Sequence, residues 1–468
     1  MRRKKNIQIS NLVLISAGAK GVAIGKTEEG KTVLVGNAVP GDVVDVQVIK
    51  SKKNYYEAKV LDFIKYSSDR ENPECIHFGI CGGCKWQNLS YEKQLEYKEK
   101  EVYNNIKRIG KIDNFQELNI IPSSDKYNYR NKMEFSFSNA RWLTSEEIQS
   151  EINVIDKDAL GFHIPQQWNK VLDIQECFLQ KEPSNKIRNS IKRFALKQNM
   201  EFYDFKEKNG FLRTLMIRSN SKNEIMILLQ FFKEDSENIE KMLNYVRDEF
   251  PEVKTILYAV NPKGNDSLYD LDIKTFHGTG FLMEEIGNLK FKIGPKSFFQ
   301  TNYKQAVKLY EITRNFAELN GEEIVYDLYT GTGTIAQFIS CKAKLVVGVE
   351  SVPEAIRAAK ENAEYNNISN CRFYCGDMKD IFTEEFIYEN GYPDVIITDP
   401  PREGMHKNVV NTILRIAPKK VVYVSCNSAT QARDLEIMKE KYEVIKVQAV
   451  DMFPQTYHVE SVALLKLK

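Results

Sequence analysis

The chain has 468 residues, enough for two or three domains, and a formal net charge of only +2, which excludes a globally basic nucleic-acid binder. No run of 18 apolar residues is present, so a membrane span is excluded. The apolar stretch Leu12 to Ile15 near the basic start is too short for a signal peptide, and we expect a cytoplasmic protein. In a reducing compartment, eight cysteines favour metal binding or catalysis over disulfides.

Residues 9–66 alternate short β-rich runs with glycine turns, which predicts a small β-barrel of about five strands within an N-terminal domain, 1–66. Residues 1–66 hold 12 Lys and Arg against 6 Asp and Glu, a local excess that favours a polyanionic partner. Basic and aromatic residues occur together in one stretch, as on a surface that binds nucleic acid, although a solvated hairpin can have the same composition. These residues are Lys50, Lys52, Lys53, Tyr55 and Tyr56.

The next segment, "ECIHFGICGGCKW", places Cys75, Cys81 and Cys84 close together, with Cys177 much later. By spacing alone, zinc and an iron–sulfur cluster fit these thiols equally well. Residues 91–111 predict one charged amphipathic helix, which can pack on the C-terminal domain. Residues 67–290 predict a central α+β domain with strands at 133–139, 213–220, 224–232 and 255–260.

Residues 291–468 form the third predicted domain. From residue 323 onward, apolar runs bounded by turns alternate with helical patterns, which predicts a doubly wound parallel sheet. Ser351 stands three residues before Glu354, and this spacing predicts a capping box at the start of a helix.

The loop "DLYTGTGT" (327–334) follows a predicted strand, and Gly331 and Gly333 allow a tight turn close to a ligand. The spacing is not G-x-G-x-x-G and no Walker lysine follows, which disfavours a dinucleotide or ATP site. Glu350 ends the next strand and can accept hydrogen bonds from ribose hydroxyls, while Asp377 ends the third and can bind an adenine amino group. The arrangement resembles the S-adenosylmethionine site of class I methyltransferases.

Two further strand ends carry reactive groups. Asp399, in "DPPREG", faces the crevice where ligands bind, and similar segments occur in enzymes that methylate the adenine amino group. Cys426 follows a strand in "VYVSCNSAT". An amino nitrogen needs no thiol, whereas C5 of uracil becomes nucleophilic only after a thiolate adds to C6. A base must then remove the C5 proton, and Glu460 is the candidate.

Five motifs together resemble the RNA (uracil-5-)-methyltransferase family: "SCN", "DPPREG", "DLYTGTGT", "SFFQTN" and "HVE". The resemblance implies that Cys426 is the nucleophile and Glu460 the base. It implies cofactor contacts from Gln300, Tyr329, Glu350, Asp377 and Asp399, and a place near the flipped uracil for Phe298. "YRNKMEF" resembles a family segment in which Arg130 and Lys132 contact RNA, although a solvated strand edge fits these two residues nearly as well.

The resemblance extends to the N-terminal half of the chain. Residues 9–66 look like the TRAM domain, an OB-like RNA-binding module. The spacing of Cys75, Cys81, Cys84 and Cys177 is similar to that of the family members that carry a [4Fe–4S] cluster.

The predicted activity is therefore S-adenosylmethionine-dependent formation of 5-methyluridine in structured RNA, with a flipped target base. Family analogy favours 23S ribosomal RNA, with transfer RNA as the alternative. Two other hypotheses are an adenine amino methyltransferase and a non-catalytic RNA-binding iron or redox sensor. Nothing in the sequence implies a protein partner.

Overall fold

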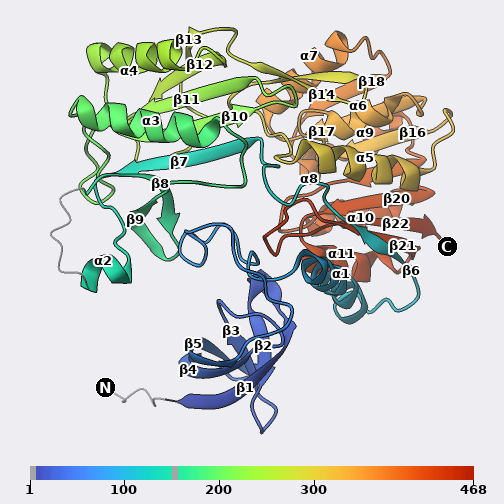
Figure 1. The fold of residues 1–468 in the computed structure, drawn as a ribbon. Helices are drawn as coiled ribbons and strands as arrows, with labels where there is room; N and C mark the ends of the chain where they lie inside the picture. The colour runs from blue at the N-terminus through green and yellow to red at the C-terminus, as the bar shows by residue number, and fades with distance from the viewer. Residues whose placement is uncertain (1–6, 150–156) are drawn as a thin grey trace.

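The computed structural model describes residues 7–149 and 157–468, and the basic residues Arg2, Arg3, Lys4 and Lys5 lie outside them. The described chain begins with a closed barrel in the strand order β1-β2-β3-β5-β4 (Figure 1). Alternating apolar residues such as Leu14, Val33 and Val46 fill its interior, which confirms the predicted five-stranded barrel. Its elements are β1 (Gln8–Ala17), η1 (Ala19–Gly21), β2 (Ala23–Lys26), β3 (Thr32–Val35), β4 (Val43–Ser51) and β5 (Tyr55–Lys65).

A buried ion pair joins the barrel to the segment that follows it. Asp42 is fully buried, and its carboxylate accepts hydrogen bonds of 2.8 Å from Arg70 Nε and Nη2. It also accepts bonds from the backbone N–H groups of Val39 and Ser67. These partners compensate for the loss of water around the carboxylate.

The central part is a seven-stranded sheet in the order β13-β12-β11-β10-β7-β8-β9, with α3 and α4 packed on it (Figure 1). The four strands predicted here are present as β7, β10, β11 and β12, within two residues of the predicted bounds. A hairpin, β14–β15, leads on to the C-terminal part. The elements are β7 (Lys132–Ser138), α2 (Ser145–Gln149), β8 (Ala159–Ile164), β9 (Gln167–Asp173), α3 (Ser184–Lys197), β10 (Leu212–Ser219), β11 (Ile225–Phe231), α4 (Ser236–Glu249), β12 (Val253–Val260), β13 (Lys274–His277), β14 (Leu282–Ile286) and β15 (Leu289–Ile293).

The C-terminal part is an eight-stranded sheet in the order β18-β17-β16-β19-β20-β22-β21-β6. Strands β16 to β20 pair in parallel, whereas β22 runs antiparallel to both of its neighbours. Helices α5, α6 and α7 pack on one face, and α8 to α11 together with α1 pack on the other, so the predicted doubly wound sheet is confirmed. The elements are α5 (Tyr303–Ala317), β16 (Ile324–Leu328), α6 (Thr334–Ser340), β17 (Leu345–Glu350), α7 (Pro353–Tyr365), β18 (Cys371–Cys375), α8 (Met378–Ile381), α9 (Glu384–Asn390), β19 (Val395–Thr398), α10 (Lys407–Ile416), β20 (Lys420–Ser425), α11 (Ser428–Met438), β21 (Tyr442–Val450) and β22 (Glu460–Leu467).

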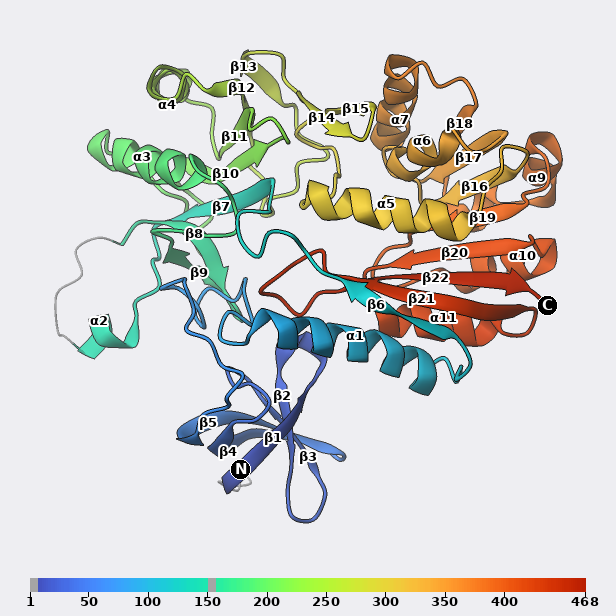
Figure 2. The same ribbon diagram turned by 45° about the vertical axis from the view of Figure 1, so that its right-hand side comes forward.

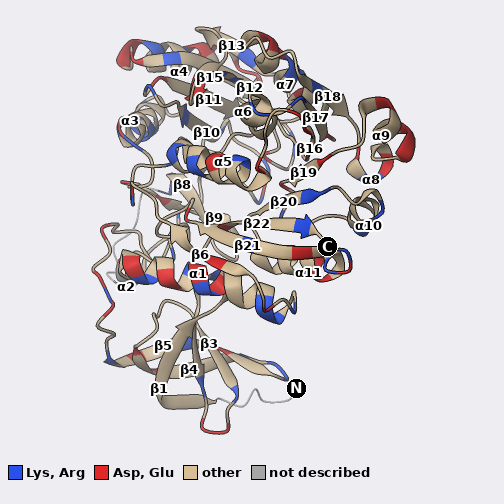
Figure 3. Ribbon diagram, turned by 90° about the vertical axis from the view of Figure 1, so that its right-hand side faces the viewer, with Lys and Arg blue, Asp and Glu red and all other residues tan. Residues whose placement is uncertain are grey.

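An early segment of the chain completes this C-terminal sheet. Helix α1 (Tyr91–Arg108) packs beside α11, and β6 (Gln116–Ile121) pairs in parallel with β21 at the edge of the sheet (Figure 2). Acidic and basic residues alternate along α1 (Figure 3). Residues 91–121, which lie within the predicted range of the central domain, therefore pack with the C-terminal sheet.

Within the described residues, no helix combines the length and the apolar character that crossing a membrane requires.

Candidate active site

One pocket of about 890 Å³ opens where strands β16 to β20 end. Carboxyl ends of parallel strands meet at one edge of a sheet, and ligands bind in the crevice there. Most of the predicted site residues line this single pocket: Phe298, Gln300, Tyr329, Gly331, Glu350, Asp377, Asp399, Cys426 and Glu460. Gly333, Arg130 and Lys132 are not among its lining residues.

The turn after β16 is left-handed at three positions, with φ of 64° at Tyr329, 56° at Gly331 and 73° at Gly333. A Cβ on Gly331 would meet no atom within 4 Å, because this glycine faces the open pocket. A Cβ on Gly333 would lie 2.9 Å from the Phe373 ring. Gly331 therefore leaves room for a ligand, and Gly333 allows the turn to pack closely on the sheet.

Glu350 is held by backbone donors at the end of β17. Its Oε2 accepts a hydrogen bond of 3.2 Å from the Gly331 N–H, and its Oε1 accepts bonds from the N–H groups of Ser351 and Val352. The Ser351 hydroxyl also donates to Glu350. The predicted capping box is therefore wrong: Val352 is the N-cap of α7 and makes no side-chain cap. The Ser351 hydroxyl bonds to the Glu350 carboxylate at the end of β17 and is therefore not available to cap the helix.

Asp377 lies at the end of β18 and is about half exposed. It is the N-cap of α8, where its carboxylate accepts a hydrogen bond of 3.1 Å from the Lys379 N–H. The Lys379 ammonium lies 3.1 Å from the other oxygen. This carboxylate remains accessible at the rim of the pocket.

Two carboxylates lie deeper. Asp327, which the sequence analysis left unassigned, is buried, and its Oδ2 accepts bonds from the Thr330 hydroxyl (2.5 Å) and the Ala336 N–H (3.1 Å). Its Oδ1 has no hydrogen-bond partner among the residues that the structure describes. Burial raises the pKa of Asp327 to about 7, and burial together with the nearby Asp327 charge raises that of Asp399 to about 7.

Strand register brings Cys426 and Glu460 together. Strands β20 and β22 are antiparallel with Ser425 opposite Ser461, so Cys426 and Glu460 are the next positions along the two strands. Burial, aided by Asp399, raises the pKa of Glu460 to about 8. Burial, with the charges of Glu460 and Asp399, raises the pKa of the Cys426 thiol to about 11. Both groups therefore retain a proton more readily than they would in water.

Arg402 is a site residue that the sequence analysis missed. It lines the pocket, and its positive charge opposes the rise in pKa of both Cys426 and Glu460. Its carbonyl accepts hydrogen bonds from Asn427 Nδ2 (2.9 Å) and the Thr430 hydroxyl (3.1 Å), which ties the loop after β19 to the start of α11. The sequence did carry a signal for this residue, because Arg402 is a cation directly after Asp-Pro-Pro and could stabilise a thiolate.

The segment that carries Phe298 and Gln300 is fixed by the central sheet. The buried Arg218 guanidinium donates to the carbonyls of Gly294 (2.8 Å) and Ser297 (2.9 Å). Asn131 Nδ2 donates to the Gln300 carbonyl at 3.0 Å. Phe298 itself is 72% exposed, although it is a large apolar side chain.

A second pocket, of about 670 Å³, adjoins the first and shares Phe298, Arg402 and Phe453 with it. It is lined by Arg130, Lys132 and all four predicted metal-binding cysteines, Cys75, Cys81, Cys84 and Cys177. Lys132 pairs with Glu134 at 2.6 Å, which reduces the charge that it presents to the pocket.

The four thiols are free, and those of Cys75, Cys84 and Cys177 have raised pKa values, chiefly through burial. For Cys84 the pKa reaches about 12, and the three other thiols contribute to the rise. No three or more His, Cys, Asp or Glu side chains among the described residues are grouped as a metal ion requires.

Family models match two parts of the chain: the TRAM domain at residues 12–61, and tRNA (uracil-5-)-methyltransferase at residues 222–468. An uncharacterised RNA methyltransferase of Bacteroides thetaiotaomicron is 50% identical over 96% of this chain and 100% of its own length. Another, of Porphyromonas gingivalis, is 47% identical, covering 92% and 94%. The solved Pyrococcus abyssi tRNA (uracil-54, C5)-methyltransferase, in complex with S-adenosyl-L-homocysteine, aligns with a TM-score of 0.76 at 28% identity, covering 97% of this chain and 100% of its own.

The raised pKa of Glu460 predicts a pH-dependent gain in stability for Glu460→Gln. Between its ordinary value of 4.5 and about 8, the folded state retains a proton that the unfolded state has lost, so the stability of the wild type falls as pH rises through this window. Glu460→Gln has no carboxyl group at this position, so its stability does not fall with pH for this reason. Thermal or urea unfolding should therefore show its free energy of unfolding, relative to wild type, rising by roughly 1–3 kcal/mol from about pH 5 to about pH 9.

Glu322→Gln, at an exposed turn, is the matched control and should follow the wild type at every pH. A constant difference between Glu460→Gln and wild type across this range would contradict the buried, proton-retaining state of Glu460.

Proposed function

Because this chain belongs to the tRNA (uracil-5-)-methyltransferase family and is an RNA methyltransferase, we propose that it methylates C5 of a uridine in folded RNA, with S-adenosylmethionine as the methyl donor. The product is 5-methyluridine. The observation that carries the proposal is the placement of Cys426 beside Glu460 at the strand ends that line the large pocket.

The pocket fits S-adenosylmethionine in charge and shape. The Gly331 turn leaves open space, and the unpartnered Oδ1 of Asp327 suits an ammonium donor. We assign the ribose hydroxyls to Glu350, the adenine amino group to Asp377, and further contacts to Gln300, Tyr329 and Asp399. The cofactor supplies an electrophilic methyl group and a positive charge, which the surrounding carboxylates favour.

Cys426 and Glu460 carry the reaction on the uracil ring. The Cys426 thiol gives its proton to solvent, its sulfur bonds to C6, and the electron pair displaced into the ring makes C5 nucleophilic so that it can accept the methyl group. Glu460, in its ionised form, then takes the C5 proton, the C5–C6 double bond re-forms, and the bond between sulfur and C6 breaks. Arg402 favours the thiolate by its charge.

Contacts with RNA are assigned to surfaces around the mouth of the site. Phe298 is exposed at the wall that the two pockets share, where it can stack on a flipped base. Arg130 and Lys132 lie in the second pocket, beside it. The β4–β5 hairpin of the TRAM barrel exposes Lys52 and Lys53, which can contact phosphates at a greater distance from the target.

The expected substrate is 23S ribosomal RNA, and transfer RNA is the second candidate. One observation favours the second: the solved Pyrococcus abyssi enzyme, similar over the whole chain, is a tRNA methyltransferase. The combination of a barrel and a catalytic domain in one chain therefore does not distinguish ribosomal RNA from transfer RNA as the substrate.

Methyl transfer from labelled S-adenosylmethionine to undermodified ribosomal and transfer RNA pools tests the proposed function. We expect labelled 5-methyluridine in 23S RNA on nucleoside analysis. The same nucleoside confined to transfer RNA would retain the chemistry and establish the second candidate. Labelled N6-methyladenosine would favour the adenine hypothesis. RNA binding without transfer would favour the sensor hypothesis.

The covalent step makes a separate prediction. RNA carrying 5-fluorouridine should form a denaturation-resistant complex with the enzyme and cofactor, because Glu460 cannot remove fluorine from C5 as it removes a proton. Cys426→Ala should abolish this complex and lower methyl transfer by at least about 10³-fold. Full activity in Cys426→Ala would contradict the covalent route and favour amino methylation.

We also propose that Cys75, Cys81, Cys84 and Cys177 hold a [4Fe–4S] cluster. Supporting this, all four thiols line one pocket, and a four-iron cluster holds its thiolates farther apart than a single ion does. The thiols must lose their protons on binding, and iron would compensate for the burial that raises the pKa of Cys84. Methyl transfer needs no electron, so the proposed role is structural.

Protein purified without oxygen should then be brown and contain about four irons per chain. Cys84→Ser should lower the iron content, whereas Cys341→Ser, at an exposed cysteine outside this pocket, should leave it unchanged. Stoichiometric zinc in place of iron would overturn the assignment.

A further inference from the structure

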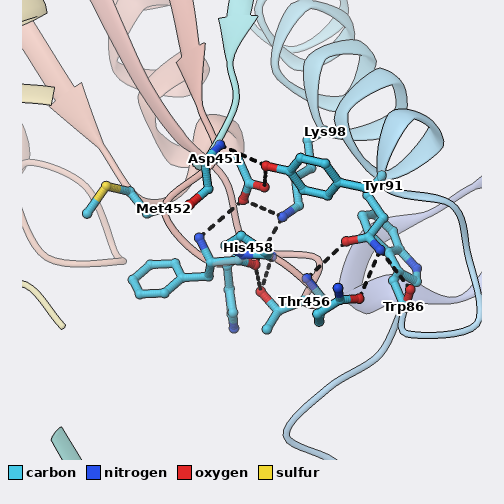
Figure 4. Close-up of polar contacts among 12 residues, drawn as sticks. Trp86, Tyr91, Lys98, Asp451, Met452, Thr456 and His458 are labelled. Carbon is cyan, nitrogen blue, oxygen red and sulfur yellow. Dashed lines mark hydrogen bonds and ion pairs between the residues drawn. The ribbon is translucent and has the colours of Figure 1, made fainter. Parts of the chain in front are cut away.

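A fully buried ion pair lies next to the catalytic pocket, outside the chemistry described above. Lys98 Nζ, on α1, lies 2.6 Å from Asp451 Oδ1, and neither side chain is exposed to solvent (Figure 4). The Tyr91 hydroxyl, also on α1, donates to Asp451 Oδ2 at 2.8 Å. Burying a charged pair is costly, and hydrophobic residues of similar volume often stabilise a fold as well. A role beyond stability is therefore worth testing at this position.

The pair holds the backbone of one pocket residue at both ends. Asp451 Oδ1 accepts a hydrogen bond of 3.1 Å from the Phe453 N–H, and Lys98 Nζ donates one of 3.1 Å to the Phe453 carbonyl. Phe453 lines both the catalytic pocket and the pocket of the four cysteines. The two charges thus fix the position of a wall that the pockets share.

The same stretch of chain connects the cofactor segment to the base. Gln305 Nε2 donates to the Asp451 carbonyl at 2.8 Å, and Asn302 Nδ2 donates to the Met452 carbonyl at 3.0 Å. These donors follow Gln300 at the start of α5. On its other side, the loop 451–459 runs directly into β22, whose first residue is Glu460. A displacement at Asp451 would therefore be transmitted to the base.

We propose that Lys98 and Asp451 are positioning residues for the proton-abstraction step. They hold the loop 451–459 so that Glu460 can reach the C5 proton of the methylated uracil. This inference rests on the proposed function. When the pair is broken, sulfur still bonds to C6 and C5 still accepts the methyl group, but removal of the C5 proton slows. The bond between Cys426 and C6 cannot break until that proton leaves, so the methylated RNA stays attached to the enzyme.

The test uses the full chain, S-adenosylmethionine and ordinary uridine RNA, with two measurements on each variant: turnover, and the fraction of enzyme in a denaturation-resistant complex with RNA. For Lys98→Met we expect turnover to fall about tenfold or more while the covalent fraction rises severalfold. Glu460→Gln is the positive control, because it should accumulate the same complex. A purely structural role for the pair predicts that turnover and covalent fraction fall together, and that result would overturn the proposal.

Arg70→Met is the matched control, because it also leaves a fully buried carboxylate, Asp42, without its cation. We expect it to lower stability without raising the covalent fraction. The double variant Lys98→Met/Asp451→Asn removes both charges and keeps an oxygen that can accept from the Phe453 N–H. It applies the same test should the single variant fail to fold. A double variant with wild-type turnover and wild-type covalent fraction would also overturn the proposal.

Measurements on the wild type distinguish a failure of the proposed function from a failure of the positioning role. If it forms no 5-methyluridine and no Cys426 complex with 5-fluorouridine RNA, the proposed function fails. If it forms both while the Lys98 variants lose turnover and covalent complex in proportion, only the positioning role fails.

Discussion

Burial of several carboxylates around one partly buried thiol, Cys426, controls the electrostatics of the large pocket. Asp327, Asp399 and Glu460 lie where water cannot fully solvate their charges, and each has a pKa well above its ordinary value. Burial, with the charges of Glu460 and Asp399, raises the pKa of the Cys426 thiol, and the charge of Arg402 opposes this rise. Such a pocket favours a cationic ligand and disfavours a free thiolate. Loading with a sulfonium cofactor would lower all of these pKa values together, so that reactivity would depend on occupancy.

The directions of the strands in the sheet bring these carboxylates and the thiol to the same edge. Parallel strands β16 to β19 deliver acidic residues at their carboxyl ends, and β20 delivers Cys426 at the same edge. Only a strand that runs the other way can bring its first residue to that edge, and β22 does so with Glu460. A slip of one residue in the β20–β22 register would turn the Glu460 side chain to the opposite face of the sheet. Such a slip would also break the buried hydrogen bond of 2.6 Å that the Ser461 hydroxyl donates to Gln431 Oε1.

Sequence patterns predicted what is local and missed what joins distant segments. Strand periodicity predicted the barrel and the parallel sheet, and the residues that end the strands predicted which side chains line the pocket. The capping box at Ser351 failed because a nearby carboxylate accepts the hydroxyl. Lys98 resembled one more solvated charge on a charged helix, since its partner Asp451 lies 353 residues away along the chain. Strand β6 has no regular alternation in its burial, and its place follows from pairing with β21.

The contacts of the loop 451–459 connect the cysteine segment to Glu460. The backbone N–H groups of Lys85 and Trp86, which directly follow Cys84, donate to the Gln455 carbonyl at 2.8 and 3.1 Å. Tyr129, packed beside Cys84, donates to the Pro454 carbonyl at 2.9 Å. A group bound by the four thiols would hold this segment and, through it, the chain that leads to Glu460. On the proposals made above, its loss would alter methyl transfer through the position of Glu460, in the same direction as a break in the Lys98–Asp451 pair.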